Sequence, residues 1–267
     1  MLYILAREAM RMQRVRHHGR ETAYRESDRG GDGPTVCCIH GSGGTSNVWK
    51  AQHRLTDRFP VVTLDLSGHG ESDDVGSDPG TETLDAYADD VVTVARETNA
   101  TVLCGNSLGG AIALRIALER DLPLDGLVLA GTGAKLAVSE PLRNALANDF
   151  DRAVSMLHEP DRLFHDAPAE YVELSKAAMR ACGRAVTERD FRTCHRFDVR
   201  DRLGEVEAPA FAVVGEHDTL TPPSYHDYLA DRIPDCKRST VADAAHLAML
   251  EEPTAFNAVL AEFLKRH

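Results

Sequence analysis

The chain has 267 residues, of which 43% are hydrophobic, so it is long enough to enclose a sizeable core in one domain, with or without an insertion. Its formal net charge of −12 argues against a nucleic-acid or anionic membrane partner, because both of these carry negative charge. No apolar run reaches the roughly 18 residues that a membrane-spanning helix needs.

The N-terminal segment and the cysteines bear on the compartment in which the protein works. The apolar run in MLYILAREAM ends at Arg7, which makes it too short for the core of a signal peptide. Residues 1–11 precede every predicted strand, so we treat them as an uncertain extension. The six cysteines include no C-x-x-C pair, so neither a disulfide framework nor a metal site is indicated. We therefore expect a reduced, cytoplasmic protein.

Short β-branched and apolar runs are predicted as strands, and helical patterns separate most of them. The predicted strands are 14–18, 21–26, 35–39, 61–65, 101–104, 126–130, 211–215 and 238–241. The helical patterns between and after them are 46–57, 82–98, 108–120, 222–232 and 253–266. Strands that alternate with helices pair in parallel and are covered on both faces. We therefore predict a three-layer α/β/α sandwich with a mostly parallel, eight-stranded sheet.

The alternation breaks between the sixth and seventh predicted strands. This stretch contains amphipathic helical patterns such as 139–157 and 168–183, and no convincing strand. A helical excursion of this length between two core strands is typical of an inserted cap. The predicted division is a core of residues 12–134 and 203–267 and a helical cap of residues 135–202.

The stretch TVLCGNSLGG contains a candidate nucleophile, Ser107. A predicted strand precedes it and a strong helical pattern, 108–120, follows it. Gly105 and Gly109 flank the serine in a G-x-S-x-G arrangement, in which a sharp turn lifts the hydroxyl off the end of the sheet. Glycine is required on both sides because a Cβ there would collide with neighbouring backbone.

A serine nucleophile needs a base, because its free hydroxyl is a poor nucleophile at neutral pH. Of the 12 histidines, His246 is the best placed, in a loop between the last predicted strand and the final helix. The carboxylate that orients this base should follow a neighbouring strand, and the strand FAVVG is followed by EHDTLTPP. Either Asp218 or Glu216 satisfies this condition on the residues alone.

The tetrahedral intermediate of acyl transfer carries a negative oxygen, which backbone N–H groups stabilise. One donor is expected at Leu108, directly after the nucleophile, where a helix begins and its first amides have no partner. The second is expected at Ser42, in the glycine-rich turn HGSGGT after the third predicted strand. His40 of that turn is expected to form structural hydrogen bonds rather than to act as a catalyst.

With these features in place, the chain resembles the α/β-hydrolase superfamily over roughly residues 14–267. The matching motifs are HGSGG (40–44), DLSGHGES (65–72), GNSLGG (105–110), GEHD (215–218) and AHLAMLEEP (245–253). The resemblance implies a Ser107–His246–Asp218 triad and selects Asp218 over Glu216, because the last position of GEHD aligns with the family acid. Ser67 replaces an arginine of many relatives in a structural turn, which leaves the implied catalysis in place.

The resemblance implies a hydrolase that cleaves a small carboxylic ester or thioester through an acyl-enzyme intermediate. Carbon–carbon bond or lactone hydrolysis and cofactor-free haloperoxidase activity are alternatives, and a non-catalytic receptor is the least favoured. The implied mechanism requires no metal or organic cofactor, and we expect a monomer or homodimer.

Residues beside the catalytic motifs and apolar residues of the cap are the candidates for contact with the substrate. They are His40, Gly41, Asn106, Leu136, Phe150, Phe164 and Leu247.

Overall fold

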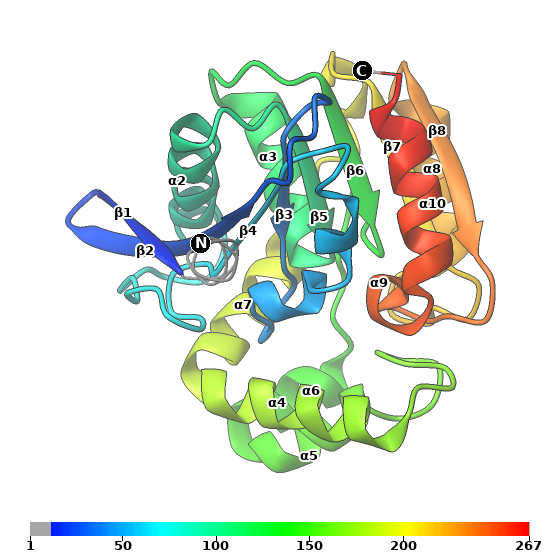
Figure 1. Cartoon of the computed structure of the whole chain (residues 1–267). Coiled ribbons are helices and arrows are strands. Elements are labelled where there is room, and N and C mark those ends of the chain that lie inside the picture. Colours follow the sequence, from blue (N-terminus) through cyan, green and yellow to red (C-terminus); the bar gives the residue numbers. More distant parts are fainter. Residues whose placement is uncertain (1–11, 267) are drawn as a thin grey trace.

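The computed structural model describes residues 12–266, so the predicted extension at 1–11 lies outside the described residues. Eight strands form one sheet in the order β1-β2-β4-β3-β5-β6-β7-β8 (Figure 1). The β1–β2 and β2–β4 pairs are antiparallel, and the other pairs are parallel. The strands are β1 (Gln13–His17), β2 (Arg20–Ser27), β3 (Val36–Ile39), β4 (Val61–Leu64), β5 (Val102–Asn106), β6 (Gly126–Ala130), β7 (Ala210–Gly215) and β8 (Cys236–Val241).

Helices lie on both faces of this sheet and beyond its edge. The 3-10 helices are η1 (Ser46–Trp49), η2 (Gln52–Leu55) and η3 (Leu203–Glu205). The α-helices are α2 (Thr81–Glu97), α3 (Leu108–Glu119), α4 (Glu140–Asn148), α5 (Phe150–Leu157), α6 (Ala169–Cys182), α7 (Arg184–Arg196), α8 (Pro223–Arg232), α9 (Ala248–Glu251) and α10 (Pro253–Leu264). Within residues 12–266, no helix is both long and apolar enough to cross a bilayer.

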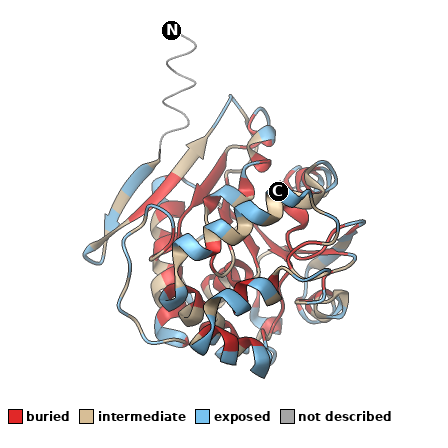
Figure 2. Cartoon of the chain, turned by 90° about the horizontal axis from the view of Figure 1, so that it is seen from below, coloured by how far each residue is buried: buried red, intermediate tan, exposed pale blue. Residues whose placement is uncertain are grey.

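Two hydrophobic clusters cover the two faces of the sheet. Successive residues of a strand point to opposite faces, and β3 shows how they divide. Cys37 and Ile39 join the cluster that includes α2, α3 and α8, whereas Val36 and Cys38 join the cluster that includes α10. The central strands are accordingly buried, while the outer sides of the helices are exposed (Figure 2). The predicted three-layer sandwich with a mostly parallel sheet is confirmed.

Two predicted helices are broken in the structure. The segment 46–57 forms η1 and η2 instead of one α-helix, because Asn257 of α10 donates its side-chain amide to the Ala51 carbonyl between them. The segment 139–157 forms α4 and α5, because Asp149 takes a non-helical conformation and accepts a hydrogen bond from the Arg152 N–H as an N-cap.

Helices α4 to α7, called the cap helices below, are inserted in the chain between β6 and β7. They form a separate layer beside the sheet (Figure 1). The boundary of the cap at residues 135–202 stays a prediction.

Asp190 of α7 joins the cap helices to the core. Its carboxylate accepts hydrogen bonds from His69 Nε2 at 2.9 Å, Tyr87 Oη at 2.7 Å and the Gly43 N–H at 3.1 Å. The side chains of His69 and Asp190 are fully buried. Burial by itself would lower the pKa of His69, but the adjacent Asp190 carboxylate raises that pKa well above its usual value. The two residues therefore form a buried ion pair.

The turn between β5 and α3 holds Ser107 in a left-handed conformation, with φ 55° and ψ −115°. A Cβ on Gly105 would collide with the backbone of Gly109, and a Cβ on Gly109 would collide with the Ile39 carbonyl oxygen. The Ser107 N–H donates to the Ala130 carbonyl at 3.0 Å. The two glycines therefore permit the close approach of α3 to β3 that this turn requires.

Replacing Gly109 with alanine should destabilise the protein by about 3 kcal/mol, because the new methyl group must displace the backbone of β3 or α3. Gly204→Ala is the matched control, since a Cβ at that exposed position meets nothing within 4 Å, and its effect should stay within about 1 kcal/mol. Denaturant unfolding of both variants makes the comparison. Equal stabilities would contradict the proposed backbone collision.

Replacing the buried pair with the double variant His69→Gln/Asp190→Asn should remove a pH-dependent part of stability. Both residues are changed because a lone buried Asp190 would itself titrate. The pKa of His69 is raised in the folded protein, so its stabilising contribution is complete below the unfolded pKa of about 6.5. That contribution is lost as the pH rises through the folded pKa.

Denaturant unfolding between about pH 6 and pH 9 measures this dependence. The free energy of unfolding of the wild type, relative to the double variant, should fall by up to about 1.4 kcal/mol per pH unit above about pH 6.5. Parallel pH profiles for the two proteins would rule out a buried, charged pair.

Candidate active site

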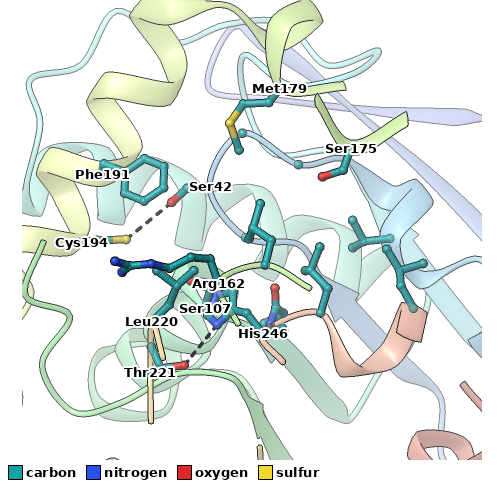
Figure 3. A pocket seen from close by; sticks show the side chains of 18 of the residues that line it. Ser42, Ser107, Arg162, Ser175, Met179, Phe191, Cys194, Leu220, Thr221 and His246 are labelled. Atoms are coloured by element: carbon teal, nitrogen blue, oxygen red, sulfur yellow. Dashed lines mark hydrogen bonds between the residues drawn. The ribbon is translucent and has the colours of Figure 1, made fainter. Parts of the chain in front are cut away.

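Ser107 lies at the carboxyl end of β5 and lines a cavity of about 610 Å³ between the sheet and the cap helices (Figure 3). The Thr132 hydroxyl donates to the Ser107 carbonyl at 2.8 Å and so supports the turn from the neighbouring β6 side. A strained serine at the end of a parallel strand presents its hydroxyl to the cavity instead of to the helix.

His246 lines the same cavity from the loop between β8 and α9. Its Nδ1 lies 2.9 Å from Asp218 Oδ2, and the Asp218 side chain is fully buried. Nδ1 therefore donates to the carboxylate, which leaves Nε2 free to accept a proton. The backbone of His246 is held on both sides, by the Arg162 carbonyl at 3.3 Å and the Asn106 amide at 3.2 Å.

Asp218 is anchored by its own loop after β7. Oδ1 accepts hydrogen bonds from the N–H groups of Leu220 at 2.8 Å and Thr221 at 2.9 Å, and the Thr221 hydroxyl donates to Oδ2 at 2.8 Å. Burial by itself would raise the pKa of Asp218, but His246, which is positively charged when protonated, and these hydrogen bonds lower that pKa below its usual value. Asp218 therefore remains a carboxylate, whereas Glu216 is exposed.

The turn after β3 lies directly against the nucleophile. A Cβ on Gly41 would come within 3.1 Å of the Ser107 Cβ, and Ser42 lines the cavity. Leu108 is the first residue of α3, so its N–H has no partner within the helix. The assignment of the Ser42 and Leu108 N–H groups as the two oxyanion donors stays a prediction.

His40 holds this turn from the inside. Its Nδ1 donates to the Gly41 carbonyl at 2.8 Å, and its Nε2 accepts from the Leu66 N–H at 3.1 Å. Burial and the neighbouring His69 lower the pKa of His40 to about 4, so the ring is neutral at physiological pH. The turn therefore rests on a buried, neutral imidazole.

The cavity brings together only some of the residues expected to contact the substrate. Gly41, Asn106, Leu136 and Leu247 line it. His40, Phe150 and Phe164 do not line it, which corrects the expectation that these three contact the substrate.

Each of the three has a packing role instead. His40 is enclosed beneath the turn that it supports. Phe164 is buried with its ring centroid 6.3 Å from that of His158, and Phe150 packs on the second hydrophobic cluster at the start of α5.

Several residues that line the cavity escaped the sequence analysis. Thr221 carried a usable signal, because an aspartate such as Asp218 accepts hydrogen bonds from the backbone that follows it, which places Thr221 beside the carboxylate. Arg162 and Phe191 carried none, because only the fold of the cap brings them to this wall.

Three further side chains near Asp218 bear on metal binding. Asp161, His165 and His217 bring potential ligand atoms within 4.8 Å of one another. The two imidazole rings are stacked, with centroids 3.6 Å apart and planes inclined by 8°. Parallel rings direct their nitrogen lone pairs along parallel planes, so one ring must rotate before both nitrogens reach a common metal ion.

Comparison with known proteins places this geometry in a family. The alpha/beta hydrolase family matches residues 38–259. The chain is similar to the "Putative carbamate hydrolase RutD" of Agrobacterium fabrum, with 28% identity over 92% of this chain and 96% of the relative. It is also similar to the pimeloyl-[acyl-carrier protein] methyl ester esterase of Neisseria meningitidis, with 28% identity over 86% and 76%.

Among solved structures, a thermophilic esterase superimposes with a TM-score of 0.84 and 29% identity, over 96% of this chain and 98% of that one. The family match covers most of the chain, includes the β3 turn, Ser107 and His246, and agrees with the resemblance seen in the motifs. The chain belongs to the α/β hydrolase family.

Proposed function

We propose that this protein is a serine hydrolase that cleaves a small carboxylic ester or thioester through a Ser107–His246–Asp218 triad. The observation that carries the proposal is the 2.9 Å hydrogen bond from His246 to a buried Asp218 at a cavity that Ser107 also lines. Similarity to an esterase and to a methyl ester esterase supports an ester as the substrate. The cavity volume falls within the range of about 300–1,000 Å³ that small-molecule sites occupy.

In the first half of the reaction, His246 Nε2 accepts the proton of the Ser107 hydroxyl while Oγ attacks the carbonyl carbon. The negative oxygen of the tetrahedral intermediate accepts hydrogen bonds from the N–H groups of Ser42 and Leu108. When the bond to the leaving group breaks, His246 returns the proton to the departing alcohol or thiol, and the acyl group remains on Ser107.

In the second half, His246 accepts a proton from water, and the resulting hydroxide attacks the acyl-enzyme. The ester bond to Ser107 breaks, Oγ regains the proton from His246, and the carboxylic acid leaves. Asp218 keeps the proton on Nδ1 throughout and stabilises the imidazolium that forms in each half. All of these steps use groups of the chain and water.

Ser107→Ala should lower turnover by about 10⁴-fold or more, because the acyl-enzyme can no longer form. Ser139→Ala is the matched control, since Ser139 lines the same cavity and makes no side-chain cap hydrogen bond. The assay compares p-nitrophenyl esters from acetate to dodecanoate with a matching acyl-CoA series. A preference for acyl-CoA in the wild type that is lost in Ser107→Ala would assign a thioesterase. A folded wild type that hydrolyses neither series would favour a lactone, carbamate or carbon–carbon substrate.

Asp218→Asn should lower kcat by about 10⁴-fold while the fold persists, because an amide at this position favours the wrong imidazole tautomer. Glu216→Gln is the control, since it removes an exposed carboxylate two residues away, and it should retain wild-type kcat. Circular dichroism and turnover of the best p-nitrophenyl ester test both variants. Full activity of Asp218→Asn would place the orienting acid elsewhere.

A further inference from the structure

The charged residues that line the cavity are all basic. Lys50 and Arg162 lie on its wall, and no aspartate or glutamate does so among the described residues. The whole chain has 42 acidic and 30 basic residues, so an average part of its surface would carry at least as many acidic as basic side chains. Every acidic or basic side chain on the cavity wall is therefore basic in a negatively charged protein, which favours an anionic ligand.

Arg162 is held beside the catalytic histidine by its backbone. Its carbonyl accepts the His246 N–H at 3.3 Å, and its own N–H donates to the Glu159 carbonyl at 3.2 Å. From this position its half-buried side chain extends into the cavity that Ser107 and His246 line (Figure 3). A ligand bound for attack by Ser107 therefore shares one cavity with this guanidinium.

Arg162 also differs in its partners from two other cap arginines, Arg180 and Arg189. The Arg180 guanidinium pairs with Asp151 at 3.0 Å, and that of Arg189 pairs with Asp74 at 2.6 Å. In the part of the chain that the structure describes, the Arg162 guanidinium has neither an acidic partner nor a hydrogen bond. A guanidinium without such a partner, in a cavity that apolar side chains such as Leu163 and Leu220 also line, retains its full capacity to bind a carboxylate in bidentate fashion.

Lys50 has a different environment. Its ammonium lies 4.5 Å from the ring centroid of Tyr171, so it is engaged in a cation–π contact, and the residue is exposed. It adds to the positive potential of the cavity, whereas Arg162 has the free donors for direct contact.

Resting on the proposed function, we propose that the substrate carries a carboxylate in addition to its scissile ester, and that Arg162 binds this carboxylate. The substrate class is a half-ester of a dicarboxylic acid, in which the acyl part ends in a free acid. One planar guanidinium matches one carboxylate, which is why a single acid group is assigned.

The test compares kcat/KM for monomethyl esters of dicarboxylic acids with that for methyl esters of monocarboxylic acids of equal chain length. Wild type should prefer the anionic ester by about 10- to 100-fold, and Arg162→Gln should lose most of that preference. The ratio of kcat/KM for the two substrates is compared because general damage to the loop that carries His246 lowers both values and cancels in their ratio. Arg180→Gln is the control, because that arginine lies outside the cavity wall, and its ratio should equal that of the wild type.

Calorimetric titration of the half-esters into the Ser107→Ala variant, with and without Arg162→Gln, gives a readout independent of turnover. Binding that weakens by about 10- to 100-fold without Arg162 supports the assignment. Ser107-dependent hydrolysis of neutral esters with no anionic preference, or a preference that survives Arg162→Gln, would overturn the inference and leave the proposed function standing. Hydrolysis of neither series, together with no binding, would overturn both.

Discussion

The sharp turn at Ser107 is the constraint from which the geometry of the site follows. The serine takes a left-handed conformation that non-glycine residues rarely adopt, and the glycines on either side allow α3 to begin directly against β3. Hydrogen bonds from the neighbouring β6 side, at Ala130 and Thr132, hold the turn in this conformation. The strain at this residue is therefore supported by the central strands, which are the most deeply buried part of the protein.

A second constraint connects the helices above the cavity to the turn below it. Asp190 contacts the Gly43 N–H next to the proposed oxyanion donor Ser42, while it pairs with His69 and Tyr87 in the core. A displacement of α7 therefore acts on the turn that faces Ser107. Buried ion pairs contribute little net stability, yet breaking one is costly, so this pair sets the position of α7 more than it stabilises the fold.

The chemistry of the cavity combines a deprotonated acid, an oriented imidazole and a basic wall. Asp218 keeps its charge despite burial because three hydrogen bonds from its own loop and one from His246 compensate for lost water. The Arg162 carbonyl accepts the His246 N–H, so the residue that holds the backbone of the base also carries the proposed anion-binding guanidinium. The proposed acyl transfer and the proposed anion binding therefore meet at this one backbone contact.

Local sequence signals were sufficient to predict the strands and the motifs at their ends. All eight predicted strands occur, because β-branched runs bounded by turns are a local property. The prediction of single helices at 46–57 and 139–157 was wrong, because Asn257 is distant in sequence from Ala51 and the N-cap at Asp149 was not recognised.

The sequence by itself determined the fold class, the turn at Ser107 and the positions of Asp218 and His246 at neighbouring strand ends. Their placement follows from residue order, since the carboxyl ends of parallel strands meet at one edge of the sheet, whereas the choice of Asp218 over Glu216 came from the family resemblance. Only the tertiary structure decided that His40, Phe150 and Phe164 lie away from the cavity and that Arg162 lies on its wall. The reason is that local sequence does not fix how the cap helices are rotated and positioned against the sheet. Tertiary contacts such as that of Asp190 with His69 fix this position, and with it which side chains of the cap face the cavity.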